Sequence, residues 1–372
     1  MSRKLITIST IMTLMSTSVI ADVPNVAADI APIHSLVSRV MDGVGAPKLI
    51  VQSGASPHGY RLRPSEAKAL QDADHVFWMG EELTPWLDSA IGTLASKASV
   101  TTLLDQQGVI LHDFREGALF EAHDHSAHGD DDHDDHDDHD DHDDHKDHDD
   151  HKDHDDHDDH KDHDDHDDHD DHDDDKDHDD HDDHDDHDDH KDHDDHDDHD
   201  DHGSHDPHAW LSPENAKLWL NIIASKLSVS DPENAATYFM NAAAGQAEIE
   251  VMIAEVKATL KPVQGGKFVV FHDAYQYFEN DFDFYASGAI SLSDSSDPSP
   301  ARIEKVQKRI RDEGIQCVLA EPQFKKGLVA TVMEGSDATA SVIDPLGAEL
   351  ETGPKLYTRL IKNMAKTLRN CL

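Results

Sequence analysis

The stretch Lys267-Phe268-Val269-Val270-Phe271-His272-Asp273 carries the pattern that decides the fold. Its four consecutive apolar residues predict a short strand that is buried on both faces, as in parallel sheets covered by helices. Comparable apolar runs occur at 25–28, 48–52, 75–79, 316–320 and 341–343. Helical patterns lie between these runs, and strands that alternate with helices predict an α/β fold with mostly parallel sheets.

The chain has 372 residues, which is enough for two such lobes. A long helical stretch begins at Pro232, with Asp231 as its predicted cap, and continues to about Leu260. At 1.5 Å per residue this helix would be about 40 Å long. We therefore predict an N-terminal α/β lobe over 22–231, a linker helix over 232–261 and a C-terminal α/β lobe over 262–372.

The N-terminus has the features of a secretory signal peptide over residues 1–21. Basic Arg3 and Lys4 precede an apolar stretch, and Val19-Ile20-Ala21 matches the pattern that a signal peptidase recognises. The apolar stretch is too short for a transmembrane anchor, and no later segment reaches the length of about 18 apolar residues that one needs. We therefore expect a periplasmic mature protein that is not embedded in the membrane.

Most of the formal net charge of −50 comes from one low-complexity tract. Residues 130–202 contain only Asp (45), His (23) and Lys (5), so they carry −40. This tract has no apolar side chain to bury, and we expect the loop over about 121–206 to be disordered. An acidic spacer would not need a histidine at every third position. We therefore expect weak, exchangeable zinc sites along the loop, at histidines such as His133, His136, His139, His142 and His205. We expect zinc as the ligand and no nucleic acid as a partner.

The chain has two cysteines, Cys317 and Cys371. In an oxidising compartment an isolated pair predicts one disulfide. Closing a loop of about 55 residues would add about 4 kcal/mol of stability. The alternative, a thiolate metal site, would need further thiols, and the sequence has none.

Four side chains outside the tract lie where an α/β fold gathers ligands. His58 and His272 follow predicted strands, His208 precedes a predicted helix, and Asp344 follows the strand at 341–343. Because the carboxyl ends of parallel strands form the ligand-binding edge of a sheet, we expect these side chains to converge between the lobes. Three imidazoles with a carboxylate or a water form a tetrahedral site that suits zinc. The alternative is three loop histidines with no common role.

The remaining histidines have simpler interpretations. His34 lies in a helical pattern and His75 in a strand, where we expect hydrogen-bonded packing histidines. His112 lies in a short loop, where we expect it to be exposed.

Six segments, in order along the chain, resemble the zinc-specific ZnuA type of periplasmic solute-binding proteins. They are Gly54-Ala55-Ser56-Pro57-His58, Leu62-Arg63-Pro64-Ser65, Asp206-Pro207-His208-Ala209-Trp210, Phe271-His272-Asp273-Ala274-Tyr275, Ala320-Glu321-Pro322-Gln323-Phe324 and Asp344-Pro345-Leu346-Gly347. The resemblance implies two α/β lobes joined by one long helix, a metal held between them, and delivery to an ABC permease in the inner membrane. The pair Cys317 and Cys371 also resembles a disulfide that is found in part of this subgroup.

By the same resemblance, His58, His208 and His272 correspond to the three zinc histidines of the family. Some members have an acidic fourth ligand before the first histidine, but this chain has Pro57 there, so Asp344 or a water is the candidate. Related manganese carriers usually have a carboxylate at the third histidine position. Three neutral imidazoles suit Zn²⁺ better than Mn²⁺, which prefers oxygen ligands.

We predict that the protein is a monomer that captures Zn²⁺ with high affinity and is not an enzyme. Two other function classes stay open. A zinc-dependent hydrolase would need a general base, which Glu321 or Asp273 could supply, but the chain has no His-Glu-x-x-His element. A periplasmic zinc buffer would depend on the tract rather than on His272.

Overall fold

The structure is a computed structural model that describes residues 23–115, 120, 205–291, 298–323 and 326–372. The predicted signal peptide and the tract histidines His133, His136, His139 and His142 lie outside the described residues.

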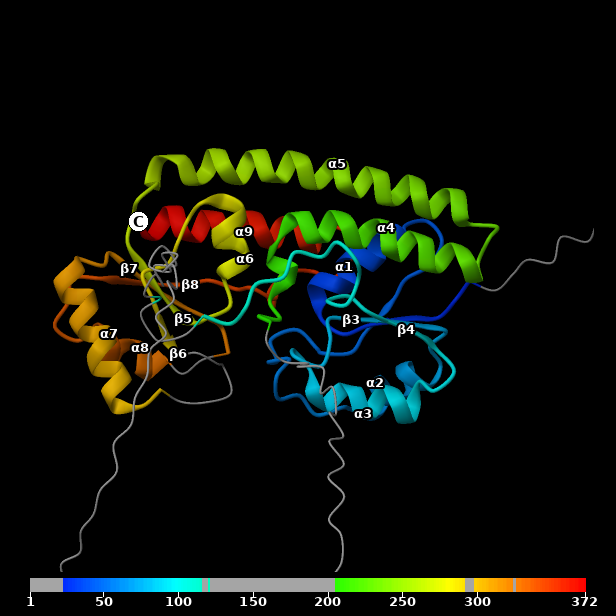
Figure 1. Cartoon of the computed structure of the whole chain (residues 1–372), viewed down its shortest axis with the longest axis horizontal. Helices are drawn as coiled ribbons and strands as arrows, with labels where there is room; N and C mark the ends of the chain where they lie inside the picture. Colours follow the sequence, from blue (N-terminus) through cyan, green and yellow to red (C-terminus); the bar gives the residue numbers. More distant parts are fainter. Residues whose placement is uncertain (1–22, 116–119, 121–204, 292–297, 324–325) are drawn as a thin grey trace, which may run out of the picture. The chain divides into compact units, whose positions relative to one another are not determined.

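Within the described residues the strands form two sheets of four parallel strands each (Figure 1). The first sheet has the order β2-β1-β3-β4 and the second the order β6-β5-β7-β8. Their bounds are β1 (Val26–Ala28), β2 (Lys48–Leu49), β3 (His75–Trp78), β4 (Ser99–Thr102), β5 (Phe268–His272), β6 (Ala289–Ser291), β7 (Cys317–Ala320) and β8 (Thr339–Val342). Parallel neighbours need a crossover between them, and helices supply these crossovers. The predicted α/β class is confirmed, whereas β4 and β6 are strands that the sequence analysis did not identify.

The helices cover both faces of each sheet. They are α1 (Ala31–Val40), α2 (Pro64–Gln71), α3 (Pro85–Leu94), α4 (Pro213–Ser230), α5 (Ala235–Leu260), α6 (Gln276–Phe282), α7 (Pro300–Glu313), α8 (Lys326–Met333) and α9 (Leu356–Cys371), with short 3₁₀ turns η2 (Ala209–Leu211) and η3 (Lys261–Val263).

Neighbouring side chains of β5 point to opposite faces: Phe268 and Val270 join one core cluster, and Val269 and Phe271 join another. This explains why the strand is apolar without interruption.

One hydrophobic core extends across both lobes. It includes β1, α1 and α4 of the first lobe, β5 and β7 of the second, and the buried faces of α5 and α9. α5 packs against α1, α4 and α9, and Figure 1 shows it running along α4 and α9. Smaller clusters lie on the opposite face of each sheet, under α2 and α3 in the first lobe and under α7 and α8 in the second. The two lobes are therefore joined by packing along α5 as well as by the chain itself.

The long helix begins later than the sequence predicted. α5 starts at Ala235 and has 26 residues, so it is about 39 Å long. Asp231, the predicted cap, instead ends α4, and its carboxylate accepts hydrogen bonds from Asn234 Nδ2 at 2.8 Å and Tyr238 Oη at 2.7 Å. The prediction of Asp231 as the cap was wrong, because Asn234 occupies the N-cap position of α5. The Asp231 carboxylate instead stabilises the turn between α4 and α5.

The predicted disulfide is confirmed. Cys317 in β7 and Cys371 at the end of α9 are bonded, with their Cα atoms 5.6 Å apart. The bond holds the last helix against the second sheet.

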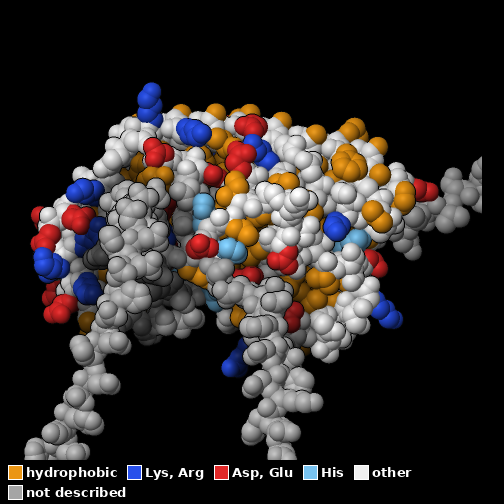
Figure 2. All heavy atoms as spheres, viewed as in Figure 1, with side chains coloured by type: hydrophobic (Ala, Val, Ile, Leu, Met, Phe, Trp, Pro, Cys, Tyr) orange, Lys and Arg blue, Asp and Glu red, His pale blue; other side chains and the backbone are white. Residues whose placement is uncertain are grey.

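The surface of the described residues shows two contrasting areas. On the face drawn in Figure 2, acidic and basic side chains alternate over the end that carries α7, while hydrophobic side chains gather over α4 and the start of α5. Exposed apolar residues of these two helices include Val229, Phe239 and Met240. None of the described helices combines the length and apolar character needed to cross a bilayer.

Candidate metal centre

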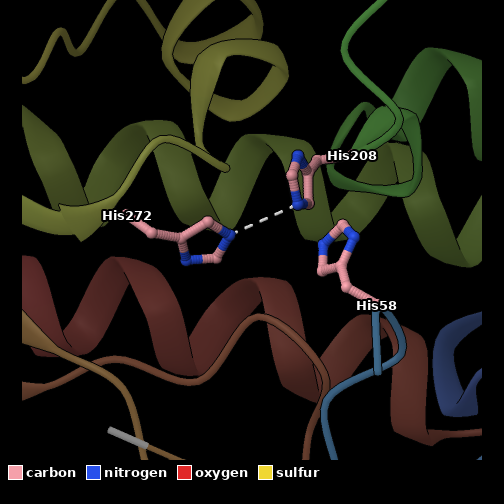
Figure 3. Close-up of side chains that lie close together, drawn as sticks. All are labelled: His58, His208 and His272. Atoms are coloured by element: carbon pink, nitrogen blue, oxygen red, sulfur yellow. Dashed lines mark hydrogen bonds between the residues drawn. The ribbon is translucent and has the colours of Figure 1, made fainter. Parts of the chain in front are cut away.

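Three histidines far apart in the sequence meet at one point (Figure 3). His58 comes from the loop that follows β2, His208 precedes η2, and His272 is the last residue of β5. One ring nitrogen of each lies within 4.8 Å of those of the other two. His208 and His272 are 5% and 3% exposed, while His58 is half-buried. The predicted convergence of these three side chains is therefore what the structure shows.

The local sequence explains why these side chains reach the same place. His272 ends a buried strand, so its ring lies at the carboxyl edge of the second sheet. His58 follows the first sheet's edge strand β2, and a hydrogen bond from its backbone N–H to Ser56 Oγ at 3.3 Å shapes its turn. Pro207 disfavours the helical conformation for the residue before it. His208 therefore lies just before η2 rather than within a helix.

Each buried histidine is oriented by its own buried carboxylate. His208 Nδ1 donates to Asp206 Oδ1 at 2.6 Å, and His272 Nδ1 donates to Glu321 Oε1 at 2.6 Å. Asp206 and Glu321 are each 2% exposed. A proton on Nδ1 leaves the lone pair of Nε2 free to bind a metal, and such carboxylate–histidine pairs are the usual outer support of zinc sites.

The spacing of the Nε2 atoms fits zinc. His208 Nε2 and His272 Nε2 lie 3.3 Å apart. With Zn–N bonds of about 2.0–2.1 Å, two ligand nitrogens of a tetrahedral zinc lie about 3.3–3.4 Å apart. Two imidazoles therefore already have the required separation, and a small approach of His58 would complete a three-nitrogen set. Neutral nitrogen ligands of this kind favour zinc over oxygen-seeking cations.

Asp344 does not belong to the group of metal-ligating atoms found among the described residues. Its Oδ1 accepts the backbone N–H groups of Leu346 and Gly347 at 3.0 and 2.8 Å, and its Oδ2 accepts that of Ala348 at 2.6 Å. These bonds hold the loop after β8, and a role as fourth ligand stays a prediction.

The other histidines with described positions lie apart from this group. His205 Nδ1 hydrogen-bonds to Asp113 Oδ1 at 2.9 Å. His34 donates from Nε2 to the Pro47 carbonyl at 3.1 Å, and His75 Nε2 contacts Ser230 Oγ at 2.6 Å. His34 and His75 are thus the hydrogen-bonded packing histidines that the sequence predicted.

His112 departs from the prediction because it is half-buried rather than exposed. Its ring packs against Tyr277, with the ring centroids 4.7 Å apart. The prediction was wrong because the sequence around His112 indicates only a short loop. A contact with Tyr277, which lies in the other lobe, leaves no signal in that local pattern.

The role of Asp206 and Glu321 in holding the two histidines was not predicted from the sequence. Asp206 lies two residues before His208, a spacing at which an Asp side chain commonly bonds to the local chain. Glu321 directly follows β7, which pairs with β5, and so its position at the same sheet edge as His272 could have been inferred.

A buried cluster of charges lies beside His272. Arg115 binds the carboxylates of Asp273 and Glu279, which are 7% and 1% exposed. Burial raises the pKa of Glu279 to about 7, although the Arg115 charge acts in the opposite direction. The guanidinium therefore compensates the charges of two carboxylates that are largely shielded from water.

The family model described as zinc-uptake complex component A, periplasmic, or ZnuA, matches residues 26–371. The chain belongs to the ZnuA family. Because this family consists of components of an uptake complex, the protein is not an enzyme, as predicted.

Relatives and solved structures agree with ZnuA membership. The high-affinity zinc uptake system protein ZnuA of Brucella abortus is 45% identical over 347 residues, which cover 93% of this chain and 91% of the relative. The protein of the same name from Paracoccus denitrificans is 40% identical over 353 residues, with 95% and 93% coverage.

A crystal structure of ZnuA superposes with a TM-score of 0.63 at 18% identity, covering 94% of this chain and 99% of that one. A crystal structure described as a ZnuA 138–173 deletion mutant with zinc bound gives a TM-score of 0.62 at 19% identity, covering 94% and 98%. At these identities the solved structures show that the ZnuA fold is shared.

Proposed function

We propose that the protein captures Zn²⁺ between its lobes, with His58, His208 and His272 as ligands, and delivers it to an ABC permease in the inner membrane. The observation that carries this proposal is the pair of Nε2 atoms 3.3 Å apart, each on a ring whose Nδ1 is held by a buried carboxylate. The names of the relatives, which describe a high-affinity zinc uptake system, support zinc as the cargo.

Further parts of the proposal rest on the sequence. Residues 1–21 act as a cleaved signal peptide, so that the mature chain works in the periplasm. The boundaries 22–231, 232–261 and 262–372 divide the mature chain into lobe, linker helix and lobe, and the mature chain works as a monomer. The loop over about 121–206 gathers zinc at weak sites and is an accessory to the three-histidine site.

The test compares the full chain with a variant in which residues 130–202 are replaced by a short Gly-Ser linker. We expect one tightly bound zinc per shortened chain, measured by metal analysis and by competition with a chelator. His272→Ala in the shortened chain should lose this zinc, because two imidazoles remain. His75→Gln is the matched control, since it changes a buried histidine outside the site.

The same experiment separates capture from buffering. If the shortened chain bound no tight zinc, or if His272→Ala bound as tightly as its parent, the three-histidine site would not be the functional one. The buffer hypothesis, in which the tract carries the function, would then be favoured.

A further inference from the structure

Two short segments that flank the tract lie beside the metal centre. Residues 112–115 follow β4 and precede the tract, and residues 205–206 follow the tract; together we call them the stem. Asp113 and His205 form an antiparallel β-bridge, and the backbone N–H of Asp206 donates to the His112 carbonyl at 2.7 Å. The two segments that flank the tract are thus paired to each other just before His208.

The stem is attached to α6 of the second lobe by one tyrosine. Tyr277 Oη donates to the Asp206 carbonyl at 2.7 Å and accepts the His112 N–H at 3.1 Å, so it binds both segments of the stem. The His112 ring packs on the same tyrosine, and Asn280 Nδ2 approaches His112 Nε2 at 3.3 Å. α6 begins four residues after His272, so the stem is held by the segment that continues from that histidine.

Arg115 makes the second attachment. Its Nε donates to Asp273 Oδ1 and Oδ2 at 3.0 and 3.1 Å, and its Nη1 donates to Glu279 Oε2 at 2.5 Å. Asp273 is the residue after His272. The guanidinium also lies over the Phe120 ring, 3.6 Å from its centroid. A planar, bidentate arginine restricts orientation as well as distance, which a lysine would not do.

On its other side the stem reaches the metal centre directly. Asp206 belongs to the stem, and its Oδ1 accepts both the ring Nδ1–H of His208 at 2.6 Å and the backbone N–H of His208 at 3.0 Å. The buried side chain of Asp206 therefore links the stem to His208, a proposed zinc ligand.

We propose that the stem is a clasp between the lobes, and that Arg115 and Tyr277 are positioning residues that keep His208 and His272 at zinc-binding separation. This inference rests on the proposed zinc capture. When the clasp is intact, the two imidazoles keep their geometry as zinc leaves and returns. When it is broken, the lobes stay joined through α5, but the two ligands are no longer held to one another.

The test uses the full chain and compares two arginines that each bind carboxylates across elements. Arg115→Met breaks the clasp. Arg39→Met is the matched control, because Arg39 of α1 binds Glu248 of α5 through two hydrogen bonds of 3.2 and 3.0 Å, away from the histidines. Tyr277→Phe is a milder clasp variant that changes no charge, and it decides the question if Arg115→Met does not fold.

Three quantities are measured for each variant: the rate of zinc dissociation into excess chelator, the visible spectrum of bound Co²⁺, and the melting temperature without metal. We expect zinc to dissociate about 10-fold faster or more from Arg115→Met, by analogy with other outer supports of metal ligands. Tyr277→Phe should change in the same direction, and both should alter the Co²⁺ spectrum, which reports ligand geometry. Arg115→Lys should recover part of the loss.

Arg39→Met should dissociate zinc at the rate of the parent even if it melts earlier. The clasp is refuted if Arg115→Met and Tyr277→Phe keep the parent's dissociation rate and Co²⁺ spectrum, whatever their melting temperatures. If the parent itself binds no zinc, the proposed function fails, and this result is distinct from a failure of the clasp.

Discussion

The side chains of His208 and His272 each use one nitrogen to bind a carboxylate and leave the other for the centre of the site. Glu321 is itself held in place, because its second oxygen accepts a hydrogen bond from Gln323 Nε2 at 2.7 Å. A proton on Nδ1 fixes the tautomer, and the negative charge beyond it makes Nε2 a stronger electron donor. The affinity for zinc therefore depends on residues that do not touch the ion.

Replacing Glu321 by glutamine tests this dependence. Glu321→Gln keeps the shape of the side chain but removes the charge from the acceptor of the His272 Nδ1–H. We expect the zinc dissociation constant to rise about 10- to 100-fold, as measured by chelator competition at neutral pH. Asp231→Asn is the control, because Asp231 is also a buried carboxylate but binds Tyr238. An unchanged affinity in Glu321→Gln would contradict the role given to this pair.

Among the elements, α1 shows how a buried histidine can have a purely structural role. His34 donates from Nε2 to the Pro47 carbonyl, while its Nδ1 lies 3.5 Å from Ser38 Oγ. Burial lowers the pKa of His34 below its usual value, although the Pro47 carbonyl acts in the opposite direction. The folded chain thus excludes a proton that the unfolded chain binds below about pH 6.5.

The lowered pKa of His34 fixes the direction in which the stability of the fold changes with pH. His34 contributes stability that is present above about pH 6.5 and is lost as the pH falls from there through the lowered pKa, by at most about 1.4 kcal/mol per pH unit. His34→Gln cannot titrate, so the free energy of unfolding of this variant should fall less on acidification than that of the parent. Urea unfolding of both chains at pH 8 and at pH 5 measures the difference. Equal losses in the two chains would show that His34 does not titrate as inferred.

The sequence predicted the elements well where one local rule determined them. Uninterrupted apolar runs identified β5 and β7, because a strand covered on both faces needs no polar side chain. β6 was missed because it has three residues, too few for a pattern. His58 and His272 could be predicted from their places at strand ends and His208 from its place before a helix. Arg115 could not be predicted, because its partners Asp273 and Glu279 lie more than 150 residues away.

The whole molecule combines a −40 tract with a remainder of −10. At neutral pH we expect the tract to attract divalent cations, because it is strongly negative and its imidazoles are mostly unprotonated. If all 23 tract histidines were protonated, the tract would carry −17. Acidification therefore weakens the attraction and blocks the ligands at the same time.

Zinc loading of the tract should consequently fail near pH 5. Calorimetric titration of zinc into a peptide spanning residues 130–202, at pH 7.5 and at pH 5, measures the number of bound ions. We expect several weakly bound ions at the higher pH and few or none at the lower. The same stoichiometry at both pH values would show that the carboxylates alone bind the metal.

The bridge between Asp113 and His205 also has a consequence for the length of the tract. Because the segments that flank the tract are paired in the stem, the number of Asp-Asp-His units between them need not change the path of the described residues. The entropy of closing a flexible segment grows only with the logarithm of its length, so that doubling it costs about 0.6 kcal/mol. Whole repeats can therefore be added to the tract or removed from it at a small cost in folding free energy, and the described residues that carry the three histidines need not move.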